Sequence, residues 1–139
     1  MDPETSRSLF TEQLQCAQTS ALAKAFGWQF EANDDRVFVL MRGRGEGKPT
    51  HLLRVTFDDF PARAPSYQFV DPKTKEAAGC VWPPNLKCRE DIPGICTPGT
   101  REFHEHYHKN DAQYPWDYKT LTVLNTLAEI NRLLERSGG

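Results

Sequence analysis

Four β-patterned segments follow one another between residues 28 and 70, and only short turn-forming stretches separate them. Residues 28–31 alternate in polarity, residues 36–41 are largely apolar, and residues 51–58 place apolar side chains on one face. Residues 66–70 form a further expected strand, after two prolines that cannot lie inside a central strand. Because strands that follow one another through tight turns pair antiparallel, the sequence predicts a four-stranded antiparallel meander.

One helix is expected before this meander in the sequence, and another after it. Residues 3–26 repeat apolar side chains in steps of three and four, with Asp2 as a cap and Gly27 as the terminating residue. Cys16 lies beside this apolar stripe and is expected to pack against the core. Residues 120–136 show a second apolar stripe. The order of helix, four strands, a long irregular segment from 71 to 103, and helix predicts an α+β domain.

The composition fits one domain spanning residues 1–139, which is enough chain for a single hydrophobic core. A net charge of −2 gives no basic stripe for nucleic acid. No apolar run is long enough to span a bilayer, and the first residues lack the features of a secretory signal. We therefore expect a cytoplasmic protein without nucleic-acid or membrane partners. In the cytoplasm its cysteines, Cys16, Cys80, Cys88 and Cys96, are expected to be reduced.

Four short stretches stand out in the second half of the chain. Residues 60–69 read Phe-Pro-Ala-Arg-Ala-Pro-Ser-Tyr-Gln-Phe, residues 83–86 read Pro-Pro-Asn-Leu, residues 94–96 read Gly-Ile-Cys, and residues 116–122 read Trp-Asp-Tyr-Lys-Thr-Leu-Thr. In this order they resemble segments of the ubiquitin-conjugating enzyme (UBC) superfamily. The matching segments there are Tyr-Pro-x-x-x-Pro-x-x-x-Phe, His-Pro-Asn-Ile, the turn with the catalytic cysteine, and Trp-Ser-Pro-x-x-Thr. The resemblance implies a UBC-like fold.

Three departures from the family pattern accompany this resemblance. Pro83 stands where the family has a histidine. The intervals from Asn85 to Cys96 and from Cys96 to Trp116 are longer than usual, and the second contains a histidine cluster. The chain also stops after the helix expected at 120–136, so the family's last two helices are expected to be absent. We interpret the chain as similar to a divergent, compact, bacterial member of the superfamily.

The resemblance implies a transferase that acts through a thioester. Cys96 would accept the C-terminal carboxyl of a ubiquitin-like protein from an adenylating activating enzyme and pass it to an amine. A nucleophilic cysteine has to be accessible, and the small, turn-forming neighbours of Cys96 favour that role. Asn85 is the candidate for stabilising the oxyanion or for holding its loop. The alternative is a catalytically inactive UBC-like module that only binds ubiquitin-like proteins.

The cluster His104-Glu105-His106-Tyr107-His108 permits several interpretations. It contains His-Glu-x-x-His, so a second alternative is a zinc-dependent hydrolase with His104 and His108 as ligands and Glu105 as base. Its apolar anchors are few, which argues against a buried metalloprotease helix. The cluster is otherwise a solvated polar insertion, or one of His104, His106 and His108 lies near Cys96 as an acid or base.

The expected cofactors follow from the cysteine spacing, and the expected partners follow from the family resemblance. The cysteines lack the Cys-x-x-Cys spacing typical of zinc sites, so we expect no metal and no other cofactor. The glycine-rich stretch 42–49 is expected to be a hairpin loop. By resemblance, the first helix and the part of this loop from Arg42 to Lys48 would dock the activating enzyme. The basic candidates for that contact are Lys24, Arg42, Arg44 and Lys48.

Overall fold

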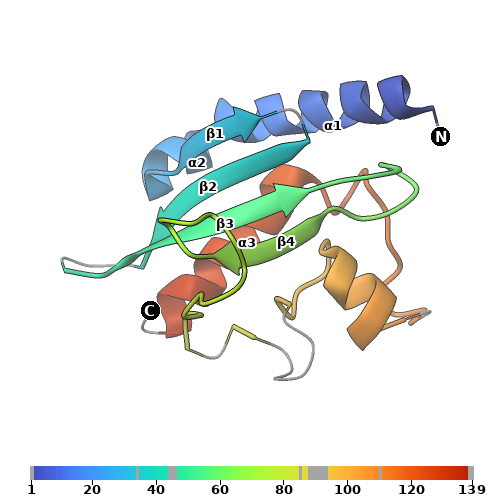
Figure 1. Ribbon diagram of the computed structural model, residues 1–139. Helices are drawn as coiled ribbons and strands as arrows, with labels where there is room; N and C mark the ends of the chain where they lie inside the picture. The colour runs from blue at the N-terminus through green and yellow to red at the C-terminus, as the bar shows by residue number, and fades with distance from the viewer. Residues whose placement is uncertain are drawn as a thin grey trace.

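A four-stranded antiparallel meander forms the centre of the computed structural model, as the sequence predicts (Figure 1). The structure describes residues 2–33, 35–43, 47–84, 86–87, 94–109 and 111–137. The strands pair in sequence order: β1 (Gln29–Asn33), β2 (Arg36–Arg42), β3 (Thr50–Thr56) and β4 (Ser66–Val70). The predicted third strand ran to residue 58, but β3 ends at Thr56, and the chain then turns toward the proline-containing segment.

The register of the sheet separates two apolar faces. Val39 lies opposite Leu53, which in turn lies opposite Phe69, and all three belong to the main core. The alternate residues form a smaller cluster on the other face, with Phe38 as its largest member. The segment after β4, yellow-green in Figure 1, covers part of that face. There Lys75 Nζ lies 5.2 Å from the centre of the Phe38 ring.

The helix predicted over 3–26 is in fact two helices, α1 (Pro3–Gln18) and α2 (Ala21–Phe26). Ser20 causes the break, because its hydroxyl accepts a hydrogen bond from the Ala23 N–H (3.1 Å) and so caps a new helix. The predicted ends are confirmed: Asp2 caps α1, and Gly27 ends α2 with a left-handed φ of 72°. The expectation that Cys16 packs is wrong, since its side chain is exposed.

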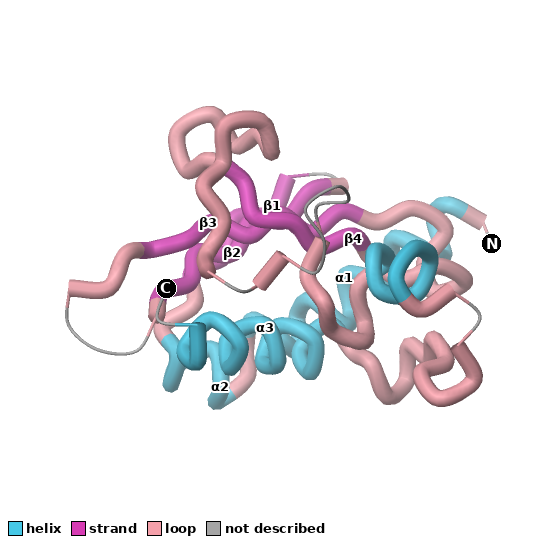
Figure 2. The backbone as a smooth tube through the Cα atoms, turned by 90° about the horizontal axis from the view of Figure 1, so that it is seen from below, coloured by secondary structure: helices cyan, strands magenta, loops and turns pink. Residues whose placement is uncertain are grey.

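The last helix, α3 (Val123–Ser137), begins after the predicted residue 120. Residues before it form a turn, in which the Leu121 N–H donates to the Asp117 carbonyl (2.8 Å). α3 packs on the same face of the sheet as α1, and Figure 2 shows α2 and α3 together on one side of the strands. The buried Asn131 accepts a hydrogen bond from the indole of Trp28 (2.8 Å), which fixes the start of β1 on α3. The two-layer α+β arrangement is therefore as expected.

The histidine cluster lies on a short helical turn that the sequence did not predict. Its central part is a single π-helical turn, η1 (Phe103–Tyr107), between the cysteine segment and the chain leading to α3 (Figure 1). Phe103 is buried and anchors η1 to the rest of the domain. Among the residues that the structure describes, no helix combines the length and apolar character needed to cross a membrane.

Candidate functional site

Cys96 presents an exposed thiol on a turn whose flanking residues are buried. Ile95 before it is 0% exposed and Thr97 after it is 2% exposed. The Thr97 N–H donates a hydrogen bond to the Ile95 carbonyl (2.9 Å), so the backbone folds tightly around Cys96. The side chain of Cys96 therefore projects from a fixed backbone, which is the arrangement that an accessible nucleophile requires.

Thr100 ties this turn to the start of η1. Its buried hydroxyl lies 3.2 Å from the Ile95 carbonyl oxygen and 3.1 Å from the Thr97 carbonyl oxygen. The same oxygen accepts a hydrogen bond from the Phe103 N–H (3.2 Å). One side chain thus satisfies backbone groups on both sides of Cys96 and at the first residue of η1. We name residues 94–100 the cysteine turn.

Glycines allow the cysteine turn to approach its neighbours closely at both ends. A Cβ at Gly94 would lie 2.6 Å from Glu102 Cβ and 2.7 Å from the Tyr107 hydroxyl oxygen. Gly99 has a φ of 103°, and a Cβ there would overlap Thr126 Oγ1 on α3. Any larger side chain at either position would displace the turn from η1 or from α3. The sequence marks these positions only as glycines, so their neighbours could not be predicted.

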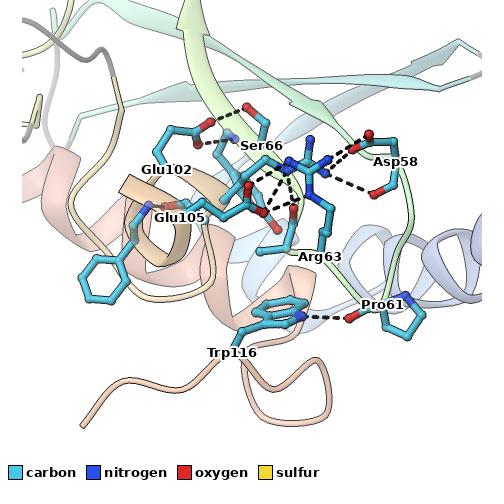
Figure 3. Close-up of polar contacts among 12 residues, drawn as sticks. Asp58, Pro61, Arg63, Ser66, Glu102, Glu105 and Trp116 are labelled. Carbon is cyan, nitrogen blue, oxygen red and sulfur yellow. Dashed lines mark hydrogen bonds and ion pairs between the residues drawn. The ribbon is translucent and has the colours of Figure 1, made fainter. Parts of the chain in front are cut away.

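Glu102 is a buried carboxyl group beside the turn that sequence reasoning missed. It is 6% exposed, accepts a hydrogen bond from the Ser66 hydroxyl (2.6 Å), and accepts a second from the Tyr67 N–H (3.2 Å) (Figure 3). Burial raises the pKa of Glu102 above the ordinary glutamate value, and its hydrogen bonds oppose that rise. Glu102 thereby links the segment after Cys96 to the edge of β4. No signal in the sequence distinguishes it from the surrounding charged residues.

Glu105 is held by Arg63 in a two-pronged ion pair. Arg63 Nη2 and Nε lie 2.8 Å and 3.0 Å from the two carboxylate oxygens of Glu105, and Arg63 Nη1 lies 3.2 Å from Asp58 (Figure 3). Hydrogen bonding by Arg63 lowers the pKa of Glu105. Arg101 also pairs with Asp58 and donates to the Ala64 carbonyl (2.9 Å). Glu105 is therefore a structural anion that joins η1 to the 58–65 segment.

His104 contacts the cysteine turn directly. Its Nε2 accepts a hydrogen bond from the Gly99 N–H (2.9 Å), and its ring lies beside Phe103 and Trp116. Burial is the largest cause that lowers the pKa of His104 below the ordinary histidine value. Of the residues predicted as acid or base, His104 therefore has a defined contact with the segment that carries Cys96.

The other two histidines of the cluster have different surroundings. His108 stacks on Phe103 with ring centres 4.2 Å apart, and its Nδ1 lies 3.0 Å from Asp111 Oδ2. His106 is exposed. Phe103 beside the cluster is buried and His104 is half-buried, so the cluster is only partly exposed to solvent. Within the described ranges, no group of three or more His, Cys, Asp or Glu side chains is arranged to hold a metal ion.

The four stretches that carry the family resemblance are linked to one another in space. The Trp116 indole donates a hydrogen bond to the Pro61 carbonyl (2.8 Å; Figure 3), so the first and last stretches touch. The Arg101 N–H, just after the cysteine turn, donates to the Pro65 carbonyl (2.8 Å). Lys87, next to the Pro-Pro-Asn-Leu stretch, forms an antiparallel bridge with Ile95. The first and last stretches thus contact each other, and residues that directly follow the second stretch and the cysteine turn contact Ile95 and Pro65.

The remaining predicted site residues lie in several parts of the chain. Asn85, Cys88 and Arg44 lie outside the described residues. Lys24 is in the last turn of α2, while Arg42 ends β2 and Lys48 precedes β3. The end of α2 and Arg42 line the same hollow of about 280 Å³, so these two predicted docking elements are neighbours.

An open groove runs beside the cysteine turn. It has a volume of about 400 Å³, and Thr97 and Pro98 form one wall. Residues of α3 form the opposite wall, among them Asn125, Glu129 and Arg132. The residues immediately after Cys96 therefore border a groove with both apolar and polar lining.

Comparison with known proteins adds no family assignment, because neither the family models nor the curated proteins include a match to this chain.

Proposed function

We propose that this protein is a UBC-like transferase that carries a ubiquitin-like protein as a thioester on Cys96. In the first step the Cys96 thiolate attacks the acyl carbon of a thioester on an adenylating activating enzyme, and that enzyme's thiolate leaves. In the second step an amine of the acceptor attacks the new thioester and loses a proton. An amide bond forms, and the Cys96 thiolate is released.

The single observation that carries this proposal is the exposed thiol of Cys96 on a buried, hydrogen-bonded turn. Exposure gives access to a large acyl donor, while the buried Ile95 and Thr97 keep the backbone at the reacting atom fixed. A packing cysteine would instead have its side chain in the core, as the half-buried Cys80 partly does. Burial also raises the pKa of the Cys80 thiol, which disfavours the reactive thiolate there.

Two further features support the proposal. The stretches at 60–69 and 116–122, chosen for their family resemblance alone, contact each other through Trp116 and Pro61. The groove bordered by Thr97 and Pro98 adjoins the cysteine turn, and we assign it to the C-terminal segment of the ubiquitin-like protein. The zinc-hydrolase alternative receives no such support, since Glu105 is bound by Arg63 and His104 by the Gly99 N–H.

The test is formation of a covalent adduct. Wild-type protein is incubated with ATP, an adenylating enzyme and a ubiquitin-like protein, with candidates taken from genes that neighbour its own. We expect an adduct that a thiol reductant cleaves, with wild type and with Cys16→Ser, which removes another exposed thiol as a matched control. Cys96→Ala should form none, and Cys96→Ser should give either no adduct or a thiol-resistant ester.

Two outcomes would reject the enzyme proposal. An adduct that forms equally well on Cys96→Ala would show that another residue is acylated. Tight binding of the ubiquitin-like protein without any adduct on wild type would favour the inactive binding module instead.

Charge reversal at Lys24, Arg42, Arg44 or Lys48 should slow the transfer of the ubiquitin-like protein to Cys96 without changing the reactivity of Cys96 toward small thiol reagents. This experiment tests these residues as the docking surface for the activating enzyme.

A further inference from the structure

The contact between His104 and Gly99 fixes the protonation state of the imidazole. Because Nε2 accepts the hydrogen bond from the Gly99 N–H, it carries no proton, so the ring is neutral. In a neutral ring the proton is then on Nδ1. Burial is the larger cause and lowers the pKa of His104, whereas the backbone of Tyr114 raises it. Nε2 of His104 is thus committed to a backbone group inside the cysteine turn.

This arrangement gives His104 a different role from that of an acid or base. Nε2 cannot exchange a proton with a substrate while the contact with the Gly99 N–H persists. The imidazole instead bridges the cysteine turn and the segment before α3. Thr126 confines the turn on the side where a Cβ at position 99 would lie.

We propose that His104 is a positioning residue for Cys96: its neutral imidazole holds the cysteine turn in place through the Gly99 N–H, and protonation of the ring releases the turn. For its consequence on catalysis this inference rests on the function proposed above. The contact itself, and its dependence on protonation, stand independently of that function. The site would therefore lose the fixed presentation of its thiol in acid.

Several charged or titratable groups face His104 and determine when the release occurs. Glu105 on the same turn favours the protonated ring, whereas His108 disfavours it. Asp111 lies across a pocket of about 190 Å³ that His104, His108, Tyr114 and Trp116 also line. This pocket gives water a route to the ring. The aromatic rings of Phe103 and Trp116 supply the burial that opposes a charge on His104.

The direction of the pH dependence follows from these surroundings. Since burial lowers the pKa of His104 in the folded protein below 6.5, the neutral ring predominates at neutral pH. The stabilisation from the contact is fully present above the unfolded-state pKa. It is lost as the pH falls from the unfolded-state pKa through the lower folded-state pKa. In this interval the unfolded or released form binds the proton, whereas the folded form with the contact intact does not.

The experiment compares wild type with His104→Gln and His104→Leu. Gln can place an amide oxygen where Nε2 lies and does not titrate, whereas Leu fills space without accepting a hydrogen bond. In wild type, the NMR amide signal of Gly99 should shift with a midpoint below the ordinary histidine pKa, and in His104→Gln it should not. In His104→Leu, hydrogen exchange of the Gly99 amide should be about 3- to 10-fold faster, as expected for one lost hydrogen bond.

The reactivity of the thiol supplies a second measurement. A dithiodipyridine reagent, followed by peptide mass spectrometry, gives the modification rate at Cys96 relative to that at the exposed Cys16. The pH should be varied from about 7.5 to about 5, a range that brackets the ordinary histidine pKa of about 6.5. Relative to His104→Gln, wild type should show a several-fold change in this ratio on acidification, and His104→Leu should show the changed ratio at every pH.

The proposal is overturned if the Gly99 amide does not titrate in wild type, or if His104→Gln titrates as wild type does. It is also overturned if His104→Gln and His104→Leu react alike at Cys96 throughout the range. The wild-type titration needs no variant, so a folding defect in either variant leaves the proposal open to refutation. None of these measurements uses an activating enzyme, so their failure is distinct from a failure of thioester formation.

Discussion

Replacing Gly99 by alanine tests the close approach between the cysteine turn and α3. The new Cβ would have to adopt a φ of 103° and would overlap Thr126 Oγ1. The left-handed backbone costs an L-residue about 1–2 kcal/mol, and overpacking against a buried side chain costs about 1–3 kcal/mol more. Alanine also reduces the entropy of the unfolded chain, which offsets about 0.4–1 kcal/mol. We therefore expect the free energy of unfolding to fall by about 1–5 kcal/mol.

Two controls separate the backbone cost from the steric cost. Gly27 has a similar left-handed φ of 72°, but an added Cβ there meets nothing within 4 Å. Gly27→Ala should therefore lower the free energy of unfolding by only about 1 kcal/mol. Thr126→Ala removes the hydroxyl and methyl groups that the new Cβ at position 99 would meet. In the double variant, about 1–2 kcal/mol of the cost of Gly99→Ala should be recovered as a coupling energy.

Urea unfolding of wild type, the three single variants and the double variant gives these differences from the shift in midpoint at constant slope. The reasoning is refuted if Gly99→Ala is no more destabilising than Gly27→Ala. It is refuted equally if the effects of Gly99→Ala and Thr126→Ala simply add, because independent sites do not restrict one another. Either result would mean that the cysteine turn is not packed against α3 as described.

Two more predictions concern the contacts that hold η1 and the motif segments. Arg63 is the main cause of the lowered pKa of Glu105, so the stabilisation from this pair is present above the ordinary glutamate pKa of 4.5 and is lost as the pH falls through the lower folded-state pKa. In Arg63→Gln, the free energy of unfolding, measured with urea at a series of pH values, should fall less steeply at acid pH than in wild type. Near neutral pH the substitution should lower the free energy of unfolding by at most about 1 kcal/mol, because both side chains are partly exposed. An unchanged fall at acid pH would contradict the pairing. Trp116→Phe keeps an aromatic ring beside Phe60 but removes the hydrogen bond to the Pro61 carbonyl, so it should lower the free energy of unfolding by about 1 kcal/mol. Full wild-type stability in thermal or urea unfolding would show that this bond contributes nothing.

The sheet could be predicted from the sequence because its signals are local. Alternation of polarity marks each strand, and short turns between strands leave little choice of partner. The single helix predicted over 3–26 was wrong because the apolar stripe continues through the break. The periodicity reports which side is buried, whereas the position of the break depends on Ser20, whose capping hydrogen bond competes with a continuous helix.

The candidate site could be predicted only in part, because its contacts join residues far apart in the chain. Cys96 was predicted as a nucleophile from its small neighbours and from the resemblance, and the structure places it in an exposed position. The burial of Glu102 and its bonds to Ser66 and Tyr67 could not be foreseen, since nothing local distinguishes it from the exposed glutamates. The pairing of Arg63 with Glu105 likewise needs the fold, because the two lie on separate segments.

The bond from the Tyr67 N–H to Glu102 has a consequence for association between copies of the chain. β4 is an edge strand of the sheet, and edge strands with unpaired N–H groups readily recruit strands from other molecules. Glu102 occupies one such group, and the Arg101 N–H binds the carbonyl of Pro65 just before β4. The segment after the cysteine turn therefore also shields this edge. Loosening η1 would expose a template for intermolecular β-pairing, so damage near the site should favour aggregation before the rest of the domain unfolds.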